Sequence, residues 1–402
     1  MSQPDMVRTI DGFAFSWPDL PIAIALSRIR ESKSGTYAEM VVTLVNGTKP
    51  RTLAHRTLNL LTGKFGIIKE LAARHEAPWD SMIEQLSVLS LRELRKGEPV
   101  ETLAPTEQDA HAYFLLNPLL YDHNPTILYG PGDSMKSLFS LYCGLLLASG
   151  VCGPNLAVAP TPFNVLVLDW EMSAQDLRGR VKALQAGDPR LTGVPAYRRC
   201  TLPLADDLAE IKAVVSDGGY DVLILDSLAM AAGGQELEKA ESAIRFNAAL
   251  RALHCTSLII GHTPKPQEGQ MERTLYGSVF FQNLCRVSWE CRREGDTLAL
   301  YARKNNLGAK HHDLGFTFTM TDHACTVTEA DLADDPILSM NLPLHLRIEA
   351  LLKKGDVLTA LAIANTLNAK LDSVRRSLQR HNGKKWVPLV ATTGTEAEWT
   401  TL

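Results

Sequence analysis

The middle of the chain alternates short apolar runs with longer mixed segments. Between residues 107 and about 333, the candidate strands are mostly continuous apolar runs; they lie at 126–129, 164–169, 222–226, 257–261, 286–290 and 297–303. Strands buried on both faces of a mostly parallel sheet have this pattern. Because the segments between them are long enough for crossover helices, we expect an α/β domain at residues 106–335.

The first part of the chain mixes two periodicities. Residues 36–45 are rich in β-branched side chains and end at Asn46-Gly47, a turn signal. Apolar residues recur at helical spacing in 53–74 and 79–96, and the segment 98–106 with its two prolines has the composition of a linker. We expect an N-terminal α+β domain at residues 1–105 that serves docking or oligomerisation.

The end of the chain predicts a third, small domain. Helical patterns at 344–352, 360–367 and 372–380 precede a strand at 385–389, and the polar tail from residue 391 is expected to be loose. Residues 341–386 contain nine Lys or Arg against three acidic residues, a local charge near +6. The domain at 341–390 is therefore basic, although the whole chain carries a formal net charge of −4.

The amino-acid composition is typical of a globular protein with several domains. Of the 402 residues, 45% are apolar and 21% charged, which is ordinary for globular proteins, and the length suggests two or three domains. The seven cysteines form no Cys-x-x-Cys pair, so we expect reduced, buried thiols and neither a zinc knuckle nor a redox motif. The N-terminus has no apolar signal core, and the longest apolar run, 138–151, is too short to span a bilayer. These features predict a cytoplasmic protein without membrane contact.

A candidate phosphate-binding loop follows the first strand of the α/β region. Its residues are Gly130, Pro131, Gly132, Asp133, Ser134, Met135, Lys136, Ser137 and Leu138. Glycines let backbone N–H groups approach phosphate at a helix N-terminus, Lys136 can reach the β- and γ-phosphates, and the Ser137 hydroxyl can bind Mg²⁺. The pattern predicts ATP and Mg²⁺ as ligands. Met135 stands where the usual last glycine would be, and a chance glycine-rich turn is the alternative.

Two apolar strands end in acidic residues. Asp226 ends the strand at 222–226, about 90 residues after Lys136, and a buried carboxylate there needs a partner or a metal. We expect it to hold the hydration shell of Mg²⁺ together with Ser137. The strand at 164–169 leads to Glu171, our candidate for the general base that activates water, with Asp169 as its rival. The alternative for Glu171 is a helix cap or an ion pair with Arg178.

Later strands supply a histidine and two cations. His262 follows the strand at 257–261 and can touch the γ-phosphate; a purely structural histidine is the alternative. Arg303 ends the strand at 297–303, and Lys304 follows it directly. A cation inserted by a neighbouring subunit can stabilise the charge of a phosphoryl-transfer transition state, whereas a solvated basic strand end is the alternative.

Together these elements resemble the RecA/DnaB-like superfamily of P-loop ATPases, and most closely the RepA-like AAA-family ATPases of phages and plasmids. The stretch DWEMS at 169–173 is similar to the strand that carries the catalytic glutamate of DnaB-like helicases. GHTPK at 261–265 resembles their sensor strand, and ARKNN at 302–306 resembles the late hairpin with trans-acting cations. The resemblance covers about residues 107–320 and implies a RecA-like domain that assembles as a homo-oligomer such as a hexamer.

Two further features qualify and extend this resemblance. The family's hairpin usually shows Lys-x-Arg, and Asn305 stands in the arginine place, so the trans-acting cation is either Arg303 or Lys304. The C-terminal region resembles a winged helix-turn-helix, whose third helix contacts DNA in many proteins and docks proteins in others. The candidate DNA-binding residues there are Lys370, Arg375, Arg376 and Arg380.

Three functions are compatible with these predictions. The first is DNA-dependent ATP hydrolysis by a ring- or filament-forming ATPase, either a replicative helicase or a recombination or loading ATPase of a phage or plasmid, with single-stranded DNA in the ring. The second is an ATP-gated DNA-binding regulator or assembly switch without unwinding. The third is a nucleotide-gated scaffold with no role on DNA. The basic C-terminal region favours the first two.

Overall fold

The computed structural model describes residues 2–32, 34–45, 49–97, 100, 102, 104, 114–159, 161–234, 237–264, 274–355, 357–389 and 397–402. The expected turn at Asn46-Gly47 and most of the expected linker at 98–106 lie outside these residues. The chain divides into two compact units, one formed by residues 1–110 with 206–218 and the other by residues 111–205 with 219–402.

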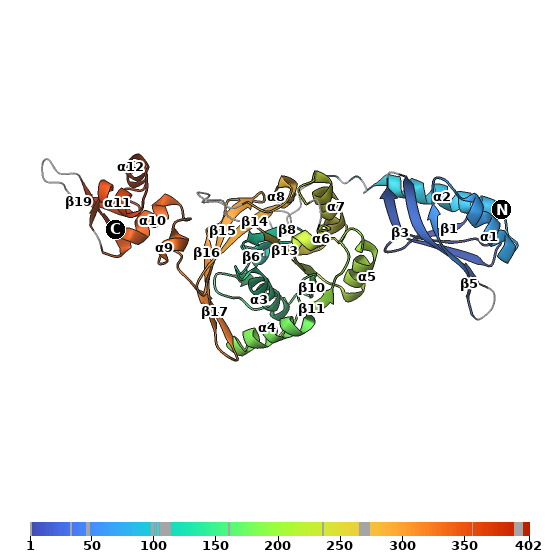
Figure 1. Ribbon diagram of the computed structural model, residues 1–402, viewed down its shortest axis with the longest axis horizontal. Helices are drawn as coiled ribbons and strands as arrows, with labels where there is room; N and C mark the ends of the chain where they lie inside the picture. The colour runs from blue at the N-terminus through green and yellow to red at the C-terminus, as the bar shows by residue number, and fades with distance from the viewer. Residues whose placement is uncertain are drawn as a thin grey trace. The chain divides into compact units, whose positions relative to one another are not determined.

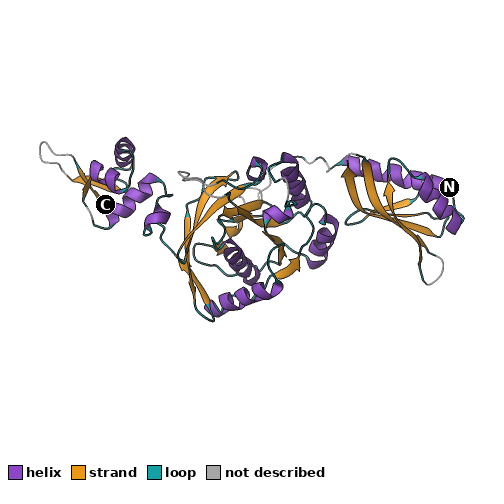
Figure 2. Cartoon of the chain, viewed as in Figure 1, coloured by secondary structure: helices purple, strands orange, loops and turns teal. Residues whose placement is uncertain are grey.

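The first unit is built on an antiparallel sheet with two covering helices. Its five strands follow in chain order from β1 to β5 and comprise Asp5–Arg8, Phe13–Ser16, Ile22–Ser32, Gly35–Leu44 and Arg51–Asn59. Helices α1 (Phe65–Arg74) and α2 (Trp79–Lys96) lie along one face of this sheet (Figure 2). Alternate residues of β4 are buried and share one core with Trp17 and Trp79. Helix α5 (Leu208–Gly218) groups with this unit.

Residues 53–59 belong to strand β5, so the helix expected from their spacing was wrong there. Val42 pairs with Ala54 and Thr43 pairs with Thr52, which leaves Leu53 as an extra residue in a β-bulge. Leu53 and Ala54 are therefore both buried. Two adjacent buried residues imitate the spacing of a helix, because the bulge interrupts the alternation of a regular strand. The helix expected at 79–96 is confirmed as α2.

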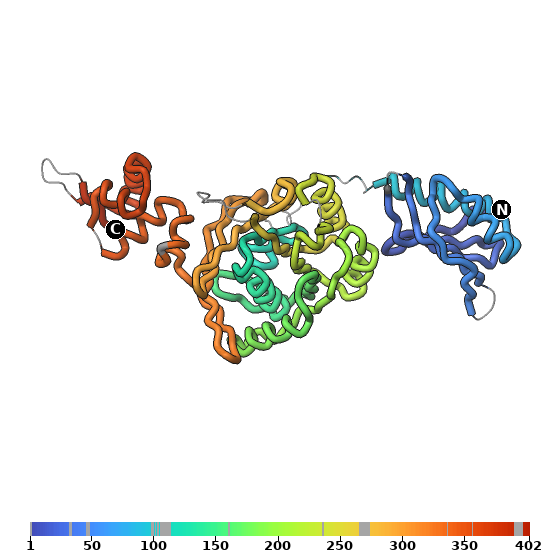
Figure 3. Tube along the Cα trace, viewed as in Figure 1, coloured from blue at the N-terminus to red at the C-terminus, as the bar shows by residue number. Residues whose placement is uncertain are grey.

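A nine-stranded sheet organises the second unit (Figure 1). Its order is β11-β10-β12-β13-β8-β14-β15-β16-β17. All neighbours from β11 to β14 in this order are parallel, and β14 to β17 then run as successive antiparallel hairpins, drawn in orange in Figure 3. The expected α/β domain with a mostly parallel sheet is confirmed.

All six expected strands of this domain are present. In chain order the strands of the large sheet are Pro125–Gly130 (β8), Val165–Asp169 (β10), Ala196–Arg199 (β11), Val222–Asp226 (β12), Thr256–His262 (β13), Val287–Glu294 (β14), Thr297–Asn305 (β15), Leu314–Met320 (β16) and Cys325–Glu329 (β17). A smaller sheet contains Phe114–Asn117 (β6), Leu120–Tyr121 (β7) and Ala157–Val158 (β9).

Helix α3 (Lys136–Ser149) accounts for the longest apolar run of the sequence. Most of its side chains are buried, and they form one core with the apolar residues of β8, β10 and β12. Such a helix is apolar on all sides because both the sheet and its neighbours cover it. The remaining helices of the domain are Ala174–Gly187 (α4), Leu228–Ala231 (α6), Ala240–Arg251 (α7), Val279–Leu284 (α8) and Pro336–Ser339 (α9).

The C-terminal segment contains the three expected helices and the expected strand. These are Leu344–Lys353 (α10), Ala360–Thr366 (α11), Leu371–Arg380 (α12) and Trp386–Leu389 (β19). They pack around the fully buried Trp386. The tail was expected to be loose, but Glu398–Thr401 forms strand β20 between β18 (Leu358–Thr359) and β19. The indole of Trp399 explains the difference, because it is buried in the same small core.

Two further findings concern the state of the cysteine thiols and the length of the helices. All seven cysteines are free thiols; five are buried as expected, whereas Cys152 is exposed and Cys255 is half-buried. In the described part of the chain, every helix falls short of the length and apolarity needed to cross a bilayer.

Candidate functional site

The loop between β8 and α3 is shaped by close packing and two left-handed residues. A Cβ atom at Gly130 would lie 2.3 Å from the carbonyl oxygen of Cys291, so only glycine fits there. Asp133 and Met135 adopt φ angles of 58° and 60°. The loop then enters α3 at Lys136, which leaves the first N–H groups of a buried helix directed at the loop. Backbone donors at a helix N-terminus form an anion site.

Lys136 lies inside this loop. Its Nζ donates to the carbonyl oxygens of Gly130 at 3.1 Å and Pro131 at 2.5 Å, and to the hydroxyl of Ser134 at 3.0 Å. Only 5% of the residue is exposed, and burial lowers the pKa of its ammonium group. Neutral carbonyls compensate a buried cation less well than phosphate oxygens do, so the side chain favours an anionic ligand.

The carboxyl ends of four parallel strands meet beside this loop. Asp169 is in register with Asp226, and His262 is in register with Gly130. Strand β13 lies between β12 and β8 and joins the two pairs in one sheet. The sheet thus brings the acidic residues, the histidine and the phosphate loop to the same edge, where parallel α/β sheets usually bind ligands.

Asp226 and Ser137 form a pair suited to a magnesium ion. The Ser137 hydroxyl interacts with the Asp226 carboxylate, and Asp226 is only 5% exposed. Burial raises the pKa of Asp226 to about 6, and the neighbouring Glu171 and Asp169 add to that rise. A hydroxyl and one carboxylate, completed by phosphate oxygens and water, match the ligands that Mg²⁺ prefers. The predicted metal ligands therefore lie together and fit the ion.

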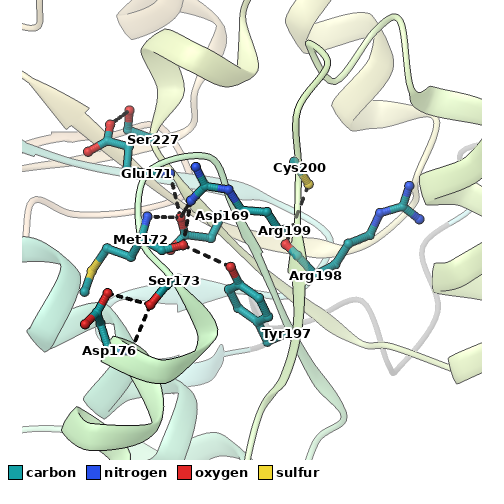
Figure 4. A network of polar contacts seen from close by, with 10 residues as sticks. All are labelled: Asp169, Glu171, Met172, Ser173, Asp176, Tyr197, Arg198, Arg199, Cys200 and Ser227. Carbon is teal, nitrogen blue, oxygen red and sulfur yellow. Dashed lines mark hydrogen bonds and ion pairs between the residues drawn. The ribbon is translucent and has the colours of Figure 1, made fainter.

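Asp169 and Glu171 have different surroundings (Figure 4). Asp169 is fully buried, and its Oδ1 accepts the N–H groups of Glu171 at 2.6 Å and Met172 at 2.7 Å. Its carboxylate thereby shapes the turn after β10. Glu171 has 43% of its side chain exposed, its Oε1 lies 3.8 Å from Nε2 of His262, and it accepts a short hydrogen bond from the Ser227 hydroxyl. His262 is the main cause of a lowered Glu171 pKa. The geometry favours Glu171 over Asp169 as the water-activating base.

Strand β11 holds the same turn from the other side. The carbonyl oxygen of Met172 accepts hydrogen bonds from the Tyr197 hydroxyl at 3.0 Å and from Nη1 of Arg199 at 2.6 Å. Nη1 of Arg199 also lies 3.6 Å from Oδ1 of Asp169. Figure 4 shows the two side chains reaching the turn while Arg198 points away. The residues of β11 had no role in the sequence analysis because no motif marks them.

A cleft of about 790 Å³ opens in front of these groups. The loop lines it from Gly132 to Leu138, and Glu171 and His262 lie on its wall. Gly130 and Pro131 contribute instead through the carbonyl groups that hold Lys136. Two arginines that the sequence analysis did not single out also line the cleft: Arg180 on α4 and Arg293 near the end of β14. Nη1 of Arg293 donates to the carbonyl of Asp133 at 3.3 Å.

Arg303 and Lys304 lie elsewhere. Nε and Nη2 of Arg303 donate to one oxygen of the fully buried Glu290 at 2.9 and 2.7 Å. Nζ of Lys304 donates to the carbonyls of Gln282, Asn283 and Cys285, each within 2.9 Å, at the end of α8. Both cations thus have partners in their own chain, and neither lines the cleft. A role for either cation in a neighbouring subunit stays a prediction.

The four candidate DNA-binding residues lie far along the chain on one exposed helix. Lys370 immediately precedes α12, and Arg375, Arg376 and Arg380 lie on it; all four are exposed. The opposite side of the helix buries Val374 and Leu378. The amphipathic helix therefore presents its cations to solvent, which is compatible with a phosphate backbone and equally with a solvated face.

Comparison with known proteins adds one finding on this region. Residues 99–268 match the AAA domain family, and the match includes the phosphate loop, Glu171, Asp226 and His262. Residues 99–268 carry a P-loop ATPase domain. The mostly parallel sheet is consistent with a RecA-like fold for this domain.

Two other comparisons complete the picture. Among solved structures, a KaiC-like protein from the hyperthermophilic archaeon Pyrococcus horikoshii OT3 is 15% identical, with a TM-score of 0.36, and the alignment covers 57% of this chain and 98% of that one. No curated protein matches the chain.

Proposed function

We propose that the protein hydrolyses ATP at the cleft beside Lys136. The observation that carries this proposal is the meeting of Lys136, Ser137, Glu171, Asp226 and His262 at one edge of the parallel sheet. Lys136 neutralises charge on the β- and γ-phosphates, and Glu171, held by Ser227, accepts the proton of the attacking water. Nε2 of His262 lies 3.8 Å from Oε1 of Glu171, and in this proposal His262 also contacts the γ-phosphate.

Ser137 and Asp226 hold the magnesium ion in this proposal. When bound, the ion would neutralise negative charge on the phosphates. Protein residues perform the remaining tasks: the loop N–H groups orient the phosphates, and the turn fixed by Asp169 orients Glu171. Electrostatic positioning of this kind supplies most of the catalysis in phosphoryl transfer.

We further propose that hydrolysis depends on DNA and that the protein works as a homo-oligomer, such as a hexameric helicase or a recombination or loading ATPase of a phage or plasmid. Support comes from the exposed cations of α12 in a locally basic segment of a net negative chain. The alternative is an ATP-gated DNA-binding switch that unwinds nothing. Both functions use the same ATP site, and they differ in what hydrolysis drives.

The deciding experiment measures ATP turnover with and without single-stranded DNA, beside unwinding of a forked duplex. Lys136→Ala should abolish turnover, and Glu171→Gln should retain ATP binding but lose about 10²- to 10⁴-fold in rate. The matched control is Glu329→Gln, an exposed carboxylate on β17 outside the cleft, which should behave as wild type. Normal turnover in Lys136→Ala would refute the ATPase proposal, and DNA-stimulated turnover without unwinding would favour the switch.

A further inference from the structure

An aromatic cavity lies beside the large sheet, at the end of its strands that is opposite the ATP cleft. Strand β14 runs parallel to β8, and β15 runs back, so the loop after Asn305 lies beside the start of β8 and away from Lys136. This loop, together with Phe114 and Tyr121 from the small sheet, lines an open cavity of about 610 Å³. The cavity has no role in the ATPase site described above.

The walls of the cavity are flat rings held in place. The rings of Phe114 and Tyr121 have centroids 4.0 Å apart, and Phe114 meets His311 nearly edge-on at 5.8 Å. Below them Trp289 stacks on His311 with an interplanar angle of 9°. Burial lowers the pKa of His311, which favours the uncharged form of its ring. Stacked rings on a rigid floor offer further planar molecules a surface for stacking.

Hydrogen bonds fix the loop that forms the other wall. The Tyr121 hydroxyl lies 2.8 Å from Nε2 of His311, and Asn305 donates to the Tyr121 hydroxyl at 2.9 Å and to the carbonyl of Ala309 at 2.7 Å. The side-chain oxygen of Asn305 accepts the N–H of Leu307 at 3.0 Å. Asn305 is thus a structural support for this loop, which gives a physical reason for an amide at that position.

The rim of the cavity is basic and sterically open. Lys310 and His312 are exposed on either side of His311, and Gly308 and Ala309 carry almost no side chain. The nearest acid in the loop, Asp313, is turned inward, where it accepts the N–H of Ala302 at 2.8 Å. A cation, two small residues and an aromatic floor match the phosphate and the base of a nucleotide in a strand.

We propose that this cavity binds single-stranded nucleic acid, with a base against Phe114 and His311 and the adjoining phosphate against Lys310. The inference rests on the proposed action on DNA and adds a second contact region, distinct from α12. Base-aromatic stacking tolerates every sequence because every base has a flat face, so we expect little sequence preference.

The test uses the full chain and an oligothymidylate that carries one 5-iodouracil. After irradiation, crosslinked peptides should map to Phe114 or to residues 310–312. Phe114→Leu keeps an apolar side chain and should weaken binding on the order of tenfold. Lys310→Ala should flatten the log–log salt dependence by about 0.7, the value for one phosphate contact on a single strand. The control Lys182→Ala removes an exposed cation of α4 and should leave both quantities unchanged.

Each outcome of this crosslinking and binding test either supports or refutes the proposed site. ATP turnover without DNA, together with thermal unfolding, should be the same in Phe114→Leu and wild type, which shows that the variant is folded. Crosslinks that map only elsewhere, with unchanged affinity in Phe114→Leu, would refute this site and leave the DNA-dependent function standing. Loss of the crosslink on adding excess AMP would assign the cavity to a mononucleotide and would refute the binding of single-stranded nucleic acid there. Absence of any oligonucleotide binding would refute both this site and the action on DNA.

Discussion

Met135, the residue before helix α3, has a backbone conformation that favours glycine. Its φ angle is 60°, and a left-handed conformation costs a non-glycine residue about 1–2 kcal/mol. The side chain partly offsets that cost because it packs against the apolar core around α3. The methionine therefore keeps the shape of the phosphate loop, although the sequence departs from the usual glycine.

A pair of substitutions tests this explanation. Met135→Gly should keep nucleotide affinity, because relief of the backbone cost compensates for lost packing. Met135→Val should weaken nucleotide binding and thermal stability, with a cost of about 1–2 kcal/mol, because β-branched residues tolerate positive φ angles poorly. Calorimetric titration with ADP and thermal unfolding measure both quantities. Similar affinities in the two variants would show that the φ angle of residue 135 does not control the loop.

The raised pKa of Asp226 predicts a pH effect on magnesium binding. Burial moves this pKa to about 6, so below that pH the carboxyl is protonated and cannot attract the cation. Apparent Mg²⁺ affinity in the presence of ATP should therefore fall as the pH drops below about 6. Asp226→Asn should bind Mg²⁺ weakly at every pH and show no such fall. A parallel fall in wild type and Asp226→Asn would place the titrating group elsewhere.

The same group makes a signed contribution to stability. Its folded pKa lies above the value of about 3.9 in an unfolded chain, so the folded state holds the proton more tightly. The contribution favours folding below about pH 4 and is lost as the pH rises through about 6. In the nucleotide-free protein, the difference in unfolding free energy between Asp226→Asn and wild type should therefore grow from pH 4 to pH 7. It should reach about 3 kcal/mol in favour of the variant.

At the scale of elements, the turn after β10 depends on its neighbour β11. Two donors from β11, Tyr197 and Arg199, converge on the carbonyl oxygen of Met172, and Asp169 accepts the two N–H groups of the turn. Among the described residues, the Glu171 side chain accepts one hydrogen bond, from Ser227, beside its contact with His262. The position of the proposed base is thus set mainly by the backbone of the turn.

Arg199→Ala should lower kcat by about tenfold while leaving KM for ATP unchanged, since a misplaced base is less harmful than a missing one. Arg199→Lys should restore part of the rate, because it can donate one hydrogen bond to Met172. The control is Arg198→Ala, whose side chain points away from the turn in Figure 4. An equal loss of kcat in both alanine variants would mean that β11 acts through general stability and not through this turn.

The sequence predicted elements best where their chemistry is local. Continuous apolar strands, the buried helix after the phosphate loop, and the acids at strand ends follow from period and position, and the structure shows them. Strand β5 was misread because its bulge places two adjacent residues on one face. The roles of Tyr197 and Arg199 could not be predicted, because they depend on which strand lies beside β10.

The positions of Arg303 and Lys304 depend on tertiary pairing in the same way. Their partners, Glu290 and the carbonyl groups ending α8, lie 13 or more residues earlier, and no pattern in ARKNN indicates them. Arg292 binds Glu290 as well, at 2.7 Å. Glu290 on β14 thus binds one arginine of its own strand and one of β15, and the contact with Arg303 links the two strands.

At the scale of the whole molecule, the question is how the C-terminal cations contribute to binding DNA. Removing everything after about residue 341 would be a poor test, because Leu342 and Leu346 pack with Ala299 and Tyr301 of β15. Such a truncation would uncover part of one face of the ATPase sheet at β15 and confuse loss of binding with loss of packing. Charge substitutions on α12 avoid this problem, since its cations are exposed and its buried residues stay in place.

Arg375→Ala combined with Arg376→Ala should therefore weaken duplex DNA binding without changing ATP turnover in the absence of DNA. If each arginine contacts one phosphate, the log–log salt slope should become shallower by about 0.9 per contact, because fewer counterions are released. Lys353→Ala is the matched control: it removes an exposed cation of the same segment that is paired with Glu349 at 3.1 Å and lies on α10. Fluorescence anisotropy over a range of salt concentrations gives both slopes. An unchanged slope in the double variant would show that α12 is a solvated or protein-docking face, and the DNA contacts would then have to lie in the ATPase domain.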